Sequence, residues 1–380
     1  MNEELSYWLA LAHLPKLRTN KKNEIIVRLF EEQKTIIDFF HFEPKQWKDN
    51  YELNQNEILL FQDAIKELSN YAFMVEDLLE QGYSILPITS PEYSPILKKN
   101  LGRTYAPTLI YTKGNKAIMK EKSVAIVGSR NADKVSLDFT DNIAKTASKN
   151  YKVIVSGFAK GVDKQALDSA LKYKGQSIIV LPQGISTFNS GFKKYYKHII
   201  DGDVMVLSTF YPKATWSVGL AMARNPIIYG LATEIFVAES SSKGGTWSGV
   251  VDGLRKGRKI FVRKPDFNEK NANNELIQKG AISVDAKGNV LSYEQQTVLS
   301  QKIVSETDPN DVEYKIIELL KKGVFTSKQI VETLKLDWSS RKVSTFLKEQ
   351  SEIITVKGKP LKYAHKERTV QSQKTLFDLK

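Results

Sequence analysis

Five segments of this sequence combine glycine with cationic or hydroxyl side chains beside hydrophobic stretches. They are Gly128-Ser129-Arg130 and residues 156–164 (SGFAKGVDK), 181–191 (LPQGISTFNSG), 221–231 (AMARNPIIYGL) and 239–249 (ESSSKGGTWSG). Glycine lets a ligand approach the backbone, Arg offers a planar pair of donors, and a helix start exposes unpaired N–H groups. Together the segments favour a phosphate-containing ligand. Each one alone is more commonly an ordinary turn, and Asp163 alone could be only a helix N-cap.

No signature of a common nucleotide-binding or catalytic site accompanies these segments. GSRNAD at 128–133 is not G-x-G-x-x-G, and no G-x-x-x-x-G-K-[ST] occurs, which disfavours dinucleotide and P-loop ATP binding. Ser129 and Ser156 lack an evident histidine base. The histidines lie far apart, without the spacing of metal ligands, at His13, His41, His198 and His365. We therefore expect a binding protein with no catalytic residues, no metal and no cofactor.

The elements that position these segments follow from an alternation of hydrophobic runs and helical patterns that starts at Ser123. Strands are predicted at 123–128, 152–155, 176–181, 204–208, 234–239 and 258–263, with helices at 137–148, 163–172, 192–200, 218–231 and 246–256. This alternation predicts the α/β class and a Rossmann-like, doubly wound parallel sheet. Because ligands of such sheets bind beyond the carboxyl ends of the strands, the five segments are expected on one rim.

The rest of the chain predicts further domains around a core of residues 82–294, which begins with an extended, proline-punctuated lead-in at 82–115. Residues 1–81 show helical patterns at 5–13, 23–30, 35–40 and 56–68, which predict a small helical domain of the SAM or helix-hairpin-helix type. A polar linker at 295–311 leads to residues 312–365. There, helices at 312–322, 327–334 and 340–350 and a hairpin turning at Gly358-Lys359 predict a winged-helix domain, followed by a basic tail at 366–380.

The charge of the chain favours an anionic partner. Its formal net charge is +13, and residues 106–307 hold 29 Lys and Arg against 17 Asp and Glu. Such a surplus binds polyanions through counterion release, although a Lys-rich solubility bias gives the same total. The sequence has no cysteine, no run of about 18 apolar residues and no basic N-terminal region. We expect a cytoplasmic protein with no membrane contact.

Several motifs in a fixed order make the chain resemble the DNA-processing protein A (DprA, Smf) family. The family's VGSR turn is matched at 127–130, its SGLA-(R/K)-GID segment at 156–163, its RNRII stretch at 224–228 and its N-x-LI-x-x-GA motif at 274–281. The family's pattern of Tyr, Pro and Gly in the segment before the sheet is partly matched between Tyr93 and Gly114. The resemblance covers roughly residues 82–285 and identifies the chain as a divergent member.

This resemblance implies a non-catalytic protein that binds single-stranded DNA in a basic pocket on the rim of the sheet. It also implies a homodimer that loads a RecA-type recombinase during transformation or recombination. Arg130 and Lys160 would hold phosphates. The expected DNA-binding residues are Gly128, Ser129, Arg130, Ser156, Gly157, Lys160, Gly161, Asp163, Gln183, Gly184, Arg224, Asn225, Lys243, Gly244, Gly245 and Thr246.

The winged-helix domain is expected to supply a second contact, with double-stranded DNA. The residues expected to make it are Ser340, Arg341, Lys342, Lys357 and Lys359. Domains of this type mediate protein contacts about as readily, so the role of this one stays open.

Four departures from the family pattern leave the biological pathway open, including a mobile-element or defence role. Pro226 replaces the last Arg of the RNR motif, and Leu167 replaces a His. Val262 is followed by Arg263 instead of Pro-Gly, and residues 244–249 differ from the SGS-x-x-TA loop.

Two other functions fit parts of the same pattern. One is a sensor of a nucleotide signal with the winged helix as its output. The other is a nucleotide phosphoribohydrolase, whose GG-x-GT-x-x-E loop resembles Gly244-Gly245-Thr246. That enzyme needs a carboxylate in the loop, and none occurs between Thr246 and Asp252.

Overall fold

The fold was analysed in a computed structural model, which describes residues 2–291, 312–350, 352–356 and 360–366. The chain divides into two compact units, Met1–Leu291 and Ser292–Lys380. In the described residues, no helix is long and apolar enough to span a lipid bilayer. The predicted linker at 295–311, the hairpin turn at 358–359 and all of the predicted tail beyond residue 366 lie outside the described residues.

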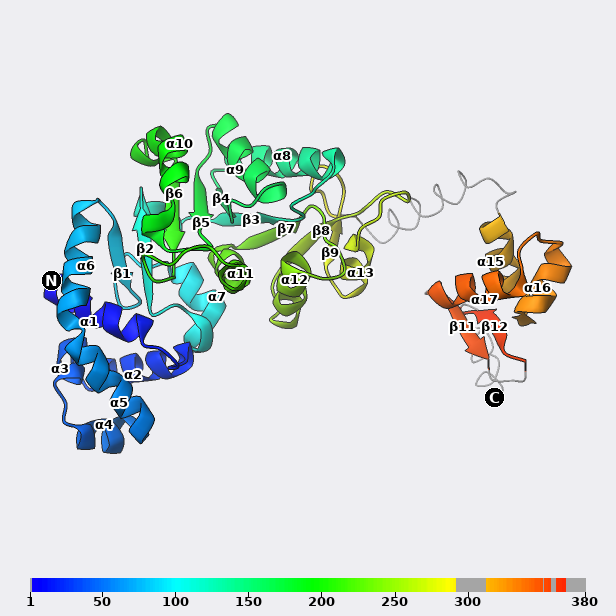
Figure 1. The fold of residues 1–380 in the computed structure, drawn as a ribbon. Coiled ribbons are helices and arrows are strands. Elements are labelled where there is room, and N and C mark those ends of the chain that lie inside the picture. The colour runs from blue at the N-terminus through cyan, green and yellow to red at the C-terminus, as the bar shows by residue number, and fades with distance from the viewer. Residues whose placement is uncertain (1, 292–311, 351, 357–359, 367–380) are drawn as a thin grey trace, which may run out of the picture. The chain divides into compact units, whose positions relative to one another are not determined.

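The first unit is built on a sheet with the strand order β1-β2-β6-β5-β4-β3-β7-β8-β9 (Figure 1). The parallel strands are β3 (Ser123–Val127), β4 (Val153–Ser156), β5 (Ser177–Val180), β6 (Val204–Ser208), β7 (Glu234–Val237), β8 (Ile260–Arg263) and β9 (Ile282–Val284). Their nearly continuous burial is typical of strands covered on both faces. The predicted α/β class and mostly parallel sheet are therefore confirmed.

The sheet extends beyond the six predicted strands at both edges. β1 (Ser84–Pro87) and β2 (Leu109–Lys113) add an antiparallel pair next to β6. β9, which the sequence analysis missed, pairs with β8 at the other edge. The chain order runs outward from β3 in both directions, through β4 to β6 and through β7 to β9. The switch point of the sheet therefore lies between β3 and β7.

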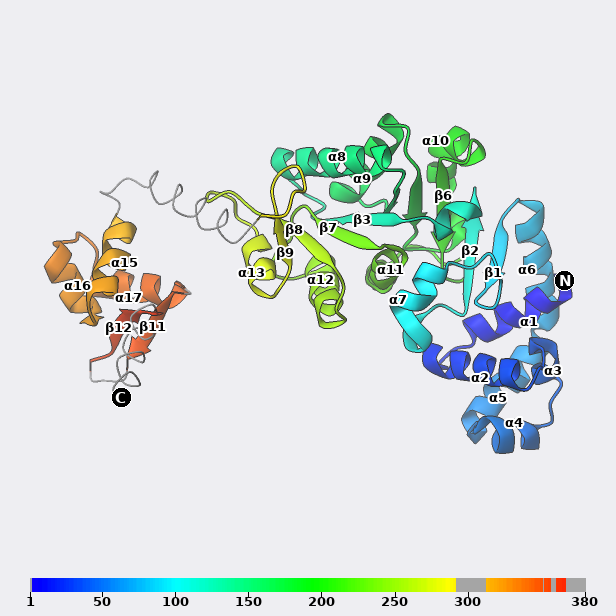
Figure 2. The same ribbon diagram turned by 180° about the vertical axis from the view of Figure 1, so that it is seen from behind.

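Helices cover both faces of the sheet (Figures 1 and 2). α8 (Lys134–Lys149), α9 (Val162–Lys172) and α10 (Asn189–Ile200) lie on one face. α7 (Pro95–Tyr105), α11 (Val218–Leu231), α12 (Gly245–Arg255) and α13 (Asn273–Gln278) lie on the other. Successive residues of β3 divide between the two layers, because Val124 packs in the hydrophobic cluster of α8 and α9 and Ala125 in that of α7 and α11.

Six helices precede the sheet: α1 (Asn2–His13), α2 (Thr19–Glu31), α3 (Ile36–Phe40), α4 (Pro44–Tyr51), α5 (Gln55–Lys66) and α6 (Leu68–Glu80). Their buried residues share one hydrophobic cluster with the sheet, in which Leu9 and Phe61 occur together with Tyr111 and Val206. A separate folding unit ending at residue 81 stays a prediction.

Three of the helices in this part of the chain, α4, α6 and α7, were missed by the sequence analysis. The predicted strand character of the lead-in at 82–115 is confirmed by β1 and β2, but its middle is not extended, because α7 lies there. Pro44 and Pro95 begin α4 and α7, where a missing N–H costs nothing, so these prolines mark helix starts and not connectors. α6 was missed because only Glu67 separates it from α5.

The second unit contains α15 (Val312–Lys322), β10 (Phe325–Thr326), α16 (Ser327–Leu334), α17 (Ser340–Glu349), β11 (Ile353–Val356) and β12 (Lys362–His365). The three helices lie where the sequence predicts them. The strands form an antiparallel sheet in the order β10-β12-β11, of which β10 was not foreseen. Ile316, Ile330 and Val343 belong to the hydrophobic core of this second unit. The assignment of this unit as a winged-helix domain stays a prediction.

Candidate functional site

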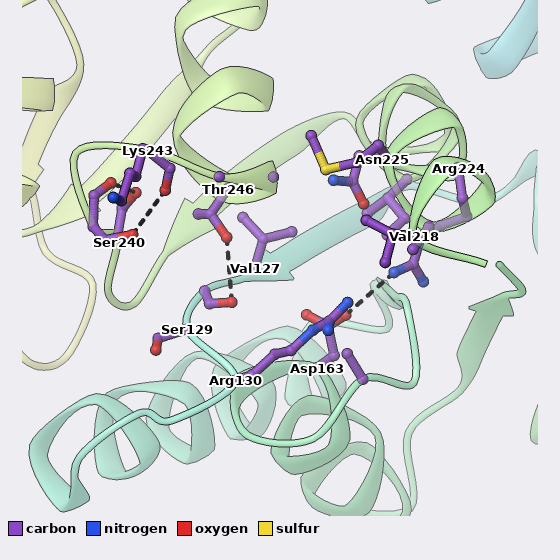
Figure 3. A pocket seen from close by; sticks show the side chains of 18 of the residues that line it. Val127, Ser129, Arg130, Asp163, Val218, Arg224, Asn225, Ser240, Lys243 and Thr246 are labelled. Carbon is purple, nitrogen blue, oxygen red and sulfur yellow. Dashed lines mark hydrogen bonds and ion pairs between the residues drawn. The ribbon is translucent and has the colours of Figure 1, made fainter. Parts of the chain in front are cut away.

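A pocket of about 400 Å³ lies at the switch point of the sheet, where β3 and β7 are neighbours (Figure 3). Its walls come from residues 128–131 after β3, from residues between 240 and 246 after β7, and from α11. We call it the switch-point pocket. The predicted residues that line it are Gly128, Ser129, Arg130, Asp163, Arg224, Asn225, Lys243, Gly244, Gly245 and Thr246.

A second pocket of about 350 Å³ adjoins the first, and we call it the adjoining pocket. Arg130 and Arg224 line both pockets, so they stand at the boundary between the two. The loops after β4 and β5 supply most of its other walls. Of the predicted residues, Gly157, Lys160 and Gln183 line this pocket alone.

Three exposed cations surround these pockets: Arg130, Lys160 and Lys243. Within residues 2–291, none of the three forms an ion pair with a carboxylate. α12 also begins at Gly245 on the wall of the switch-point pocket, and the N-terminus of a helix carries partial positive charge. The electrostatics of both pockets therefore favour an anionic ligand.

Arg224, in contrast, makes its polar contacts within the protein. Its side chain is buried on α11, and Nη1 donates hydrogen bonds to the carbonyl oxygens of Gly157 and, at 2.7 Å, of Val180. Nη2 lies 3.9 Å from Oδ2 of the buried Asp163. Arg224 thus ties α11 to the loops after β4 and β5. A direct contact of Arg224 with DNA stays a prediction.

Asp163 is the buried partner of this contact. Burial raises the pKa of Asp163 above its ordinary value, while Arg224, the backbone N–H groups of Ala159 and Gly157 and the hydroxyl of Ser156 act in the opposite direction. Asp163 is not the N-cap of α9, since Gly161 occupies that position. Its contacts fix the shape of the loop that carries Lys160.

The glycines of the rim allow its loops to pack against one another. A Cβ at Gly128 would lie 2.6 Å from Cγ2 of Val162, and a Cβ at Gly157 would lie 1.8 Å from Nη1 of Arg224. Real Cβ atoms do not approach other atoms so closely. The sequence analysis assigned Gly128 to close approach of a ligand, and in the structure its backbone is also approached by α9.

Three predicted residues, Ser156, Gly161 and Gly184, line neither pocket. Ser156 is buried and donates from Oγ to the carbonyl oxygen of Ile126 at 3.1 Å. Gly184 donates its N–H to the carbonyl oxygen of Ala214 at 2.8 Å. Gln183 does line the adjoining pocket, but its side-chain amide is bonded within its own loop, to Thr187.

The loop after β7 is held by contacts of Arg263, the residue that stands where the family has Pro-Gly. Arg263 is buried, pairs with Glu269 and donates from Nε to the carbonyl oxygen of Ala238 at 3.0 Å. Thr246 Oγ1 donates to the carbonyl oxygen of Gly128 at 3.2 Å. The altered loop is therefore fixed against the loop after β3.

Several lining residues escaped the sequence analysis: Phe158, Phe188 and Trp216 in the adjoining pocket, and Val218, Met222 and Tyr229 in the switch-point pocket. All are apolar or aromatic, and such side chains in a loop sequence give no signal of a phosphate site. In the described residues, no group of three or more His, Asp or Glu side chains is arranged to hold a metal ion.

In the second unit, Ser340, Arg341 and Lys342 are exposed in the first turn of α17. Nζ of Lys342 lies 4.0 Å from the ring centroid of Trp338, a cation–π contact. The predicted residues Lys357 and Lys359 lie outside the described residues.

Comparison with known proteins relates this chain to a protein family. Residues 84–295, more than half of the chain, match the family described as DNA recombination-mediator protein A. DNA processing protein DprA of Streptococcus pneumoniae is 32% identical over 189 residues, which are 49% of this chain and 67% of that protein. The Bacillus subtilis protein of the same name is 26% identical over 208 residues, 54% of this chain and 69% of the relative.

A solved structure agrees with these relatives. The X-ray structure of DprA from Streptococcus pneumoniae superposes with a TM-score of 0.58 at 26% identity, and covers 79% of this chain and 98% of that one. The matched region contains the whole parallel sheet and both pockets. The chain therefore belongs to the DNA recombination-mediator protein A family, the family of DprA and Smf.

Proposed function

We propose that this protein binds single-stranded DNA in the switch-point and adjoining pockets. The observation that carries the proposal is the set of three exposed cations, Arg130, Lys160 and Lys243, around two adjoining pockets. No carboxylate in the part of the chain that the structure describes pairs with them. Membership in a family of DNA recombination mediators makes DNA the expected anion.

Arg130 has the central position in this proposal. It stands at the boundary of both pockets, so a phosphate on its guanidinium would connect two nucleotides of one strand, one on each side. Lys160 would bind the phosphate beyond the adjoining pocket, and Lys243 the phosphate beyond the switch-point pocket. Three such contacts would lower the logarithm of affinity by about 2 for each tenfold rise in salt, since each phosphate on a single strand contributes about 0.7.

The proposed role is binding without catalysis. In this proposal, the protein binds exposed single-stranded DNA in the cytoplasm and delivers a RecA-type recombinase to it during transformation or recombination. A homodimer and a duplex contact through α17 of the second unit belong to the same proposal. Its support is the family membership together with the charge of the rim.

The experiment is a titration of fluorescent single-stranded and double-stranded oligonucleotides at two salt concentrations. We expect tighter binding of the single strand and a marked loss of affinity at the higher salt concentration. A panel of mononucleotides serves as the control, because a nucleotide sensor would bind one of them more tightly than any oligonucleotide. Binding of neither DNA form, or of a mononucleotide in preference, contradicts the proposal.

A further inference from the structure

Three exposed apolar side chains lie along the two pockets. Trp216 lines the adjoining pocket, and Val218 and Met222 line the switch-point pocket. Their exposed fractions are 51%, 67% and 43%. All three belong to the start of α11 or to the residues just before it. Apolar side chains gathered at the mouth of a polar pocket are typical of a binding surface.

The cations of the same pockets come from other elements. Arg130 follows β3 and Lys160 follows β4. The apolar side chains come from α11 and the residue Trp216 just before it, and Figure 3 shows Arg130 and Val218 on these different elements. The pockets therefore have a cationic side and an apolar side, which are held together by the hydrogen bonds from Arg224 to Gly157 and Val180.

Other residues that line the adjoining pocket are aromatic as well. Phe158 and Phe188 line it and contact each other edge to face, with ring centroids 5.0 Å apart. Their edge-to-face packing fixes both rings, while Trp216, which lines the same pocket, is half-exposed. A ligand that combines a flat, apolar ring with a phosphate group would match this combination of an aromatic side and a cationic side.

We propose that Trp216 is a stacking platform for one unstacked base of the bound strand, with Val218 and Met222 continuing the apolar surface towards the next base. This inference rests on the proposed function. A single strand offers both of its chemistries at once, phosphates to Arg130 and Lys160 and base faces to Trp216. In a duplex the base faces are covered by their neighbours, so the apolar side favours single strands. Stacking of this kind tolerates any base.

The test compares two ligands with the same number of phosphates: an oligo-dT and an abasic oligonucleotide of equal length. The proteins are the full chain, Trp216→Ala and Trp216→Phe. The exposed aromatic Phe267 lines neither pocket, so Phe267→Ala is the matched control. Thermal unfolding of each variant checks the fold. Because Trp216 is half-exposed, its replacement should leave the unfolding temperature nearly unchanged.

We expect the full chain to prefer oligo-dT over the abasic strand. Trp216→Ala should weaken oligo-dT binding by about tenfold to a hundredfold, the usual effect of removing an aromatic stacking partner. It should leave binding of the abasic strand unchanged, and Trp216→Phe should keep most of the preference. Phe267→Ala should match the full chain with both ligands.

Equal affinity of the full chain for both strands, or an equal effect of Trp216→Ala on both, overturns the stacking role. In either case, salt-dependent binding that needs Arg130 would leave the proposed function standing. Loss of tryptophan fluorescence on adding oligo-dT gives a second readout, and this loss should disappear in Trp216→Phe. Its full persistence in that variant would also overturn the inference.

Discussion

The guanidinium of Arg224 occupies the space that a side chain at position 157 would need. A Cβ on Gly157 would lie 1.8 Å from Nη1 of Arg224, the atom that donates to the carbonyl oxygens of Gly157 and Val180. The contact joins α11, with its apolar side chains, to the loop that carries Lys160. The two sides of the candidate site are therefore held at a fixed separation by one buried cation.

Gly157→Ala should destabilise the protein, because the added methyl group must displace a buried guanidinium. We expect the free energy of unfolding to fall by at least about 2 kcal/mol, within the range of overpacked cores. Urea unfolding measures the change. Gly219→Ala is the matched control, since Gly219 lies in α11 and its nearest atom would be 3.8 Å away. That substitution should be neutral or stabilise by about 0.5 kcal/mol. Equal stability of the two variants would refute the role of Arg224.

The structure also predicts a dependence of stability on pH through His13. Burial lowers the pKa of His13 to about 3, and the charge of Lys22 acts in the same direction. The ring forms a hydrogen bond of 2.7 Å with the hydroxyl of Tyr111. Between an ordinary pKa of about 6.5 and the lowered value, the unfolded chain binds a proton that the folded chain does not. The contribution of His13 to stability is therefore greatest above pH 6.5 and is lost progressively as the pH decreases.

His13→Gln should remove this part of the dependence. From pH 7 to pH 5 the native protein should lose about 2 kcal/mol more than the variant, since 1 pH unit below 6.5 corresponds to about 1.4 kcal/mol. Urea unfolding at the two pH values gives the difference. Parallel losses in both proteins would show that His13 does not stay neutral in the fold.

Removal of residues 308–380 should leave a folded protein that still binds single strands. The residues lining both pockets lie between 127 and 246, and the second unit has a hydrophobic core of its own. The removed part carries 15 Lys and Arg against 10 Asp and Glu, so affinity should weaken, and more for duplex than for single strands. A filter-binding comparison with the full chain decides this. Loss of single-strand binding in a folded truncated protein would place the main site elsewhere.

The sheet was predictable because its strands are buried on both faces and therefore read as continuous hydrophobic runs. β9 was not, since its three residues, Ile282–Val284, are too short for a periodic pattern. α7 was not predictable either, because a proline such as Pro95 occurs both at the first position of helices and in connectors. Local sequence determines such elements only together with the packing around them.

The rim was predictable for a related reason, since the carboxyl ends of parallel strands meet at one edge. The roles of single residues on it were not. Arg130 and Arg224 look alike in the sequence, but Arg130 is exposed whereas Arg224 is buried against two carbonyl oxygens. Trp216 gave no polar signal, and only the fold brings it to the pocket that Lys160 lines.

The central claim is that phosphates of single-stranded DNA bind the exposed cations of the rim. Its most direct test is the salt dependence of oligo-dT affinity in the full chain and in the double variant Arg130→Ala, Lys160→Ala. Exposed lysines that line neither pocket, Lys120 and Lys149, provide the control as Lys120→Ala, Lys149→Ala. We predict a large loss of affinity in the first variant only, with a salt slope lower by about 1.4 for two lost phosphate contacts. A folded Arg130→Ala, Lys160→Ala protein with the affinity and salt slope of the full chain would contradict the claim.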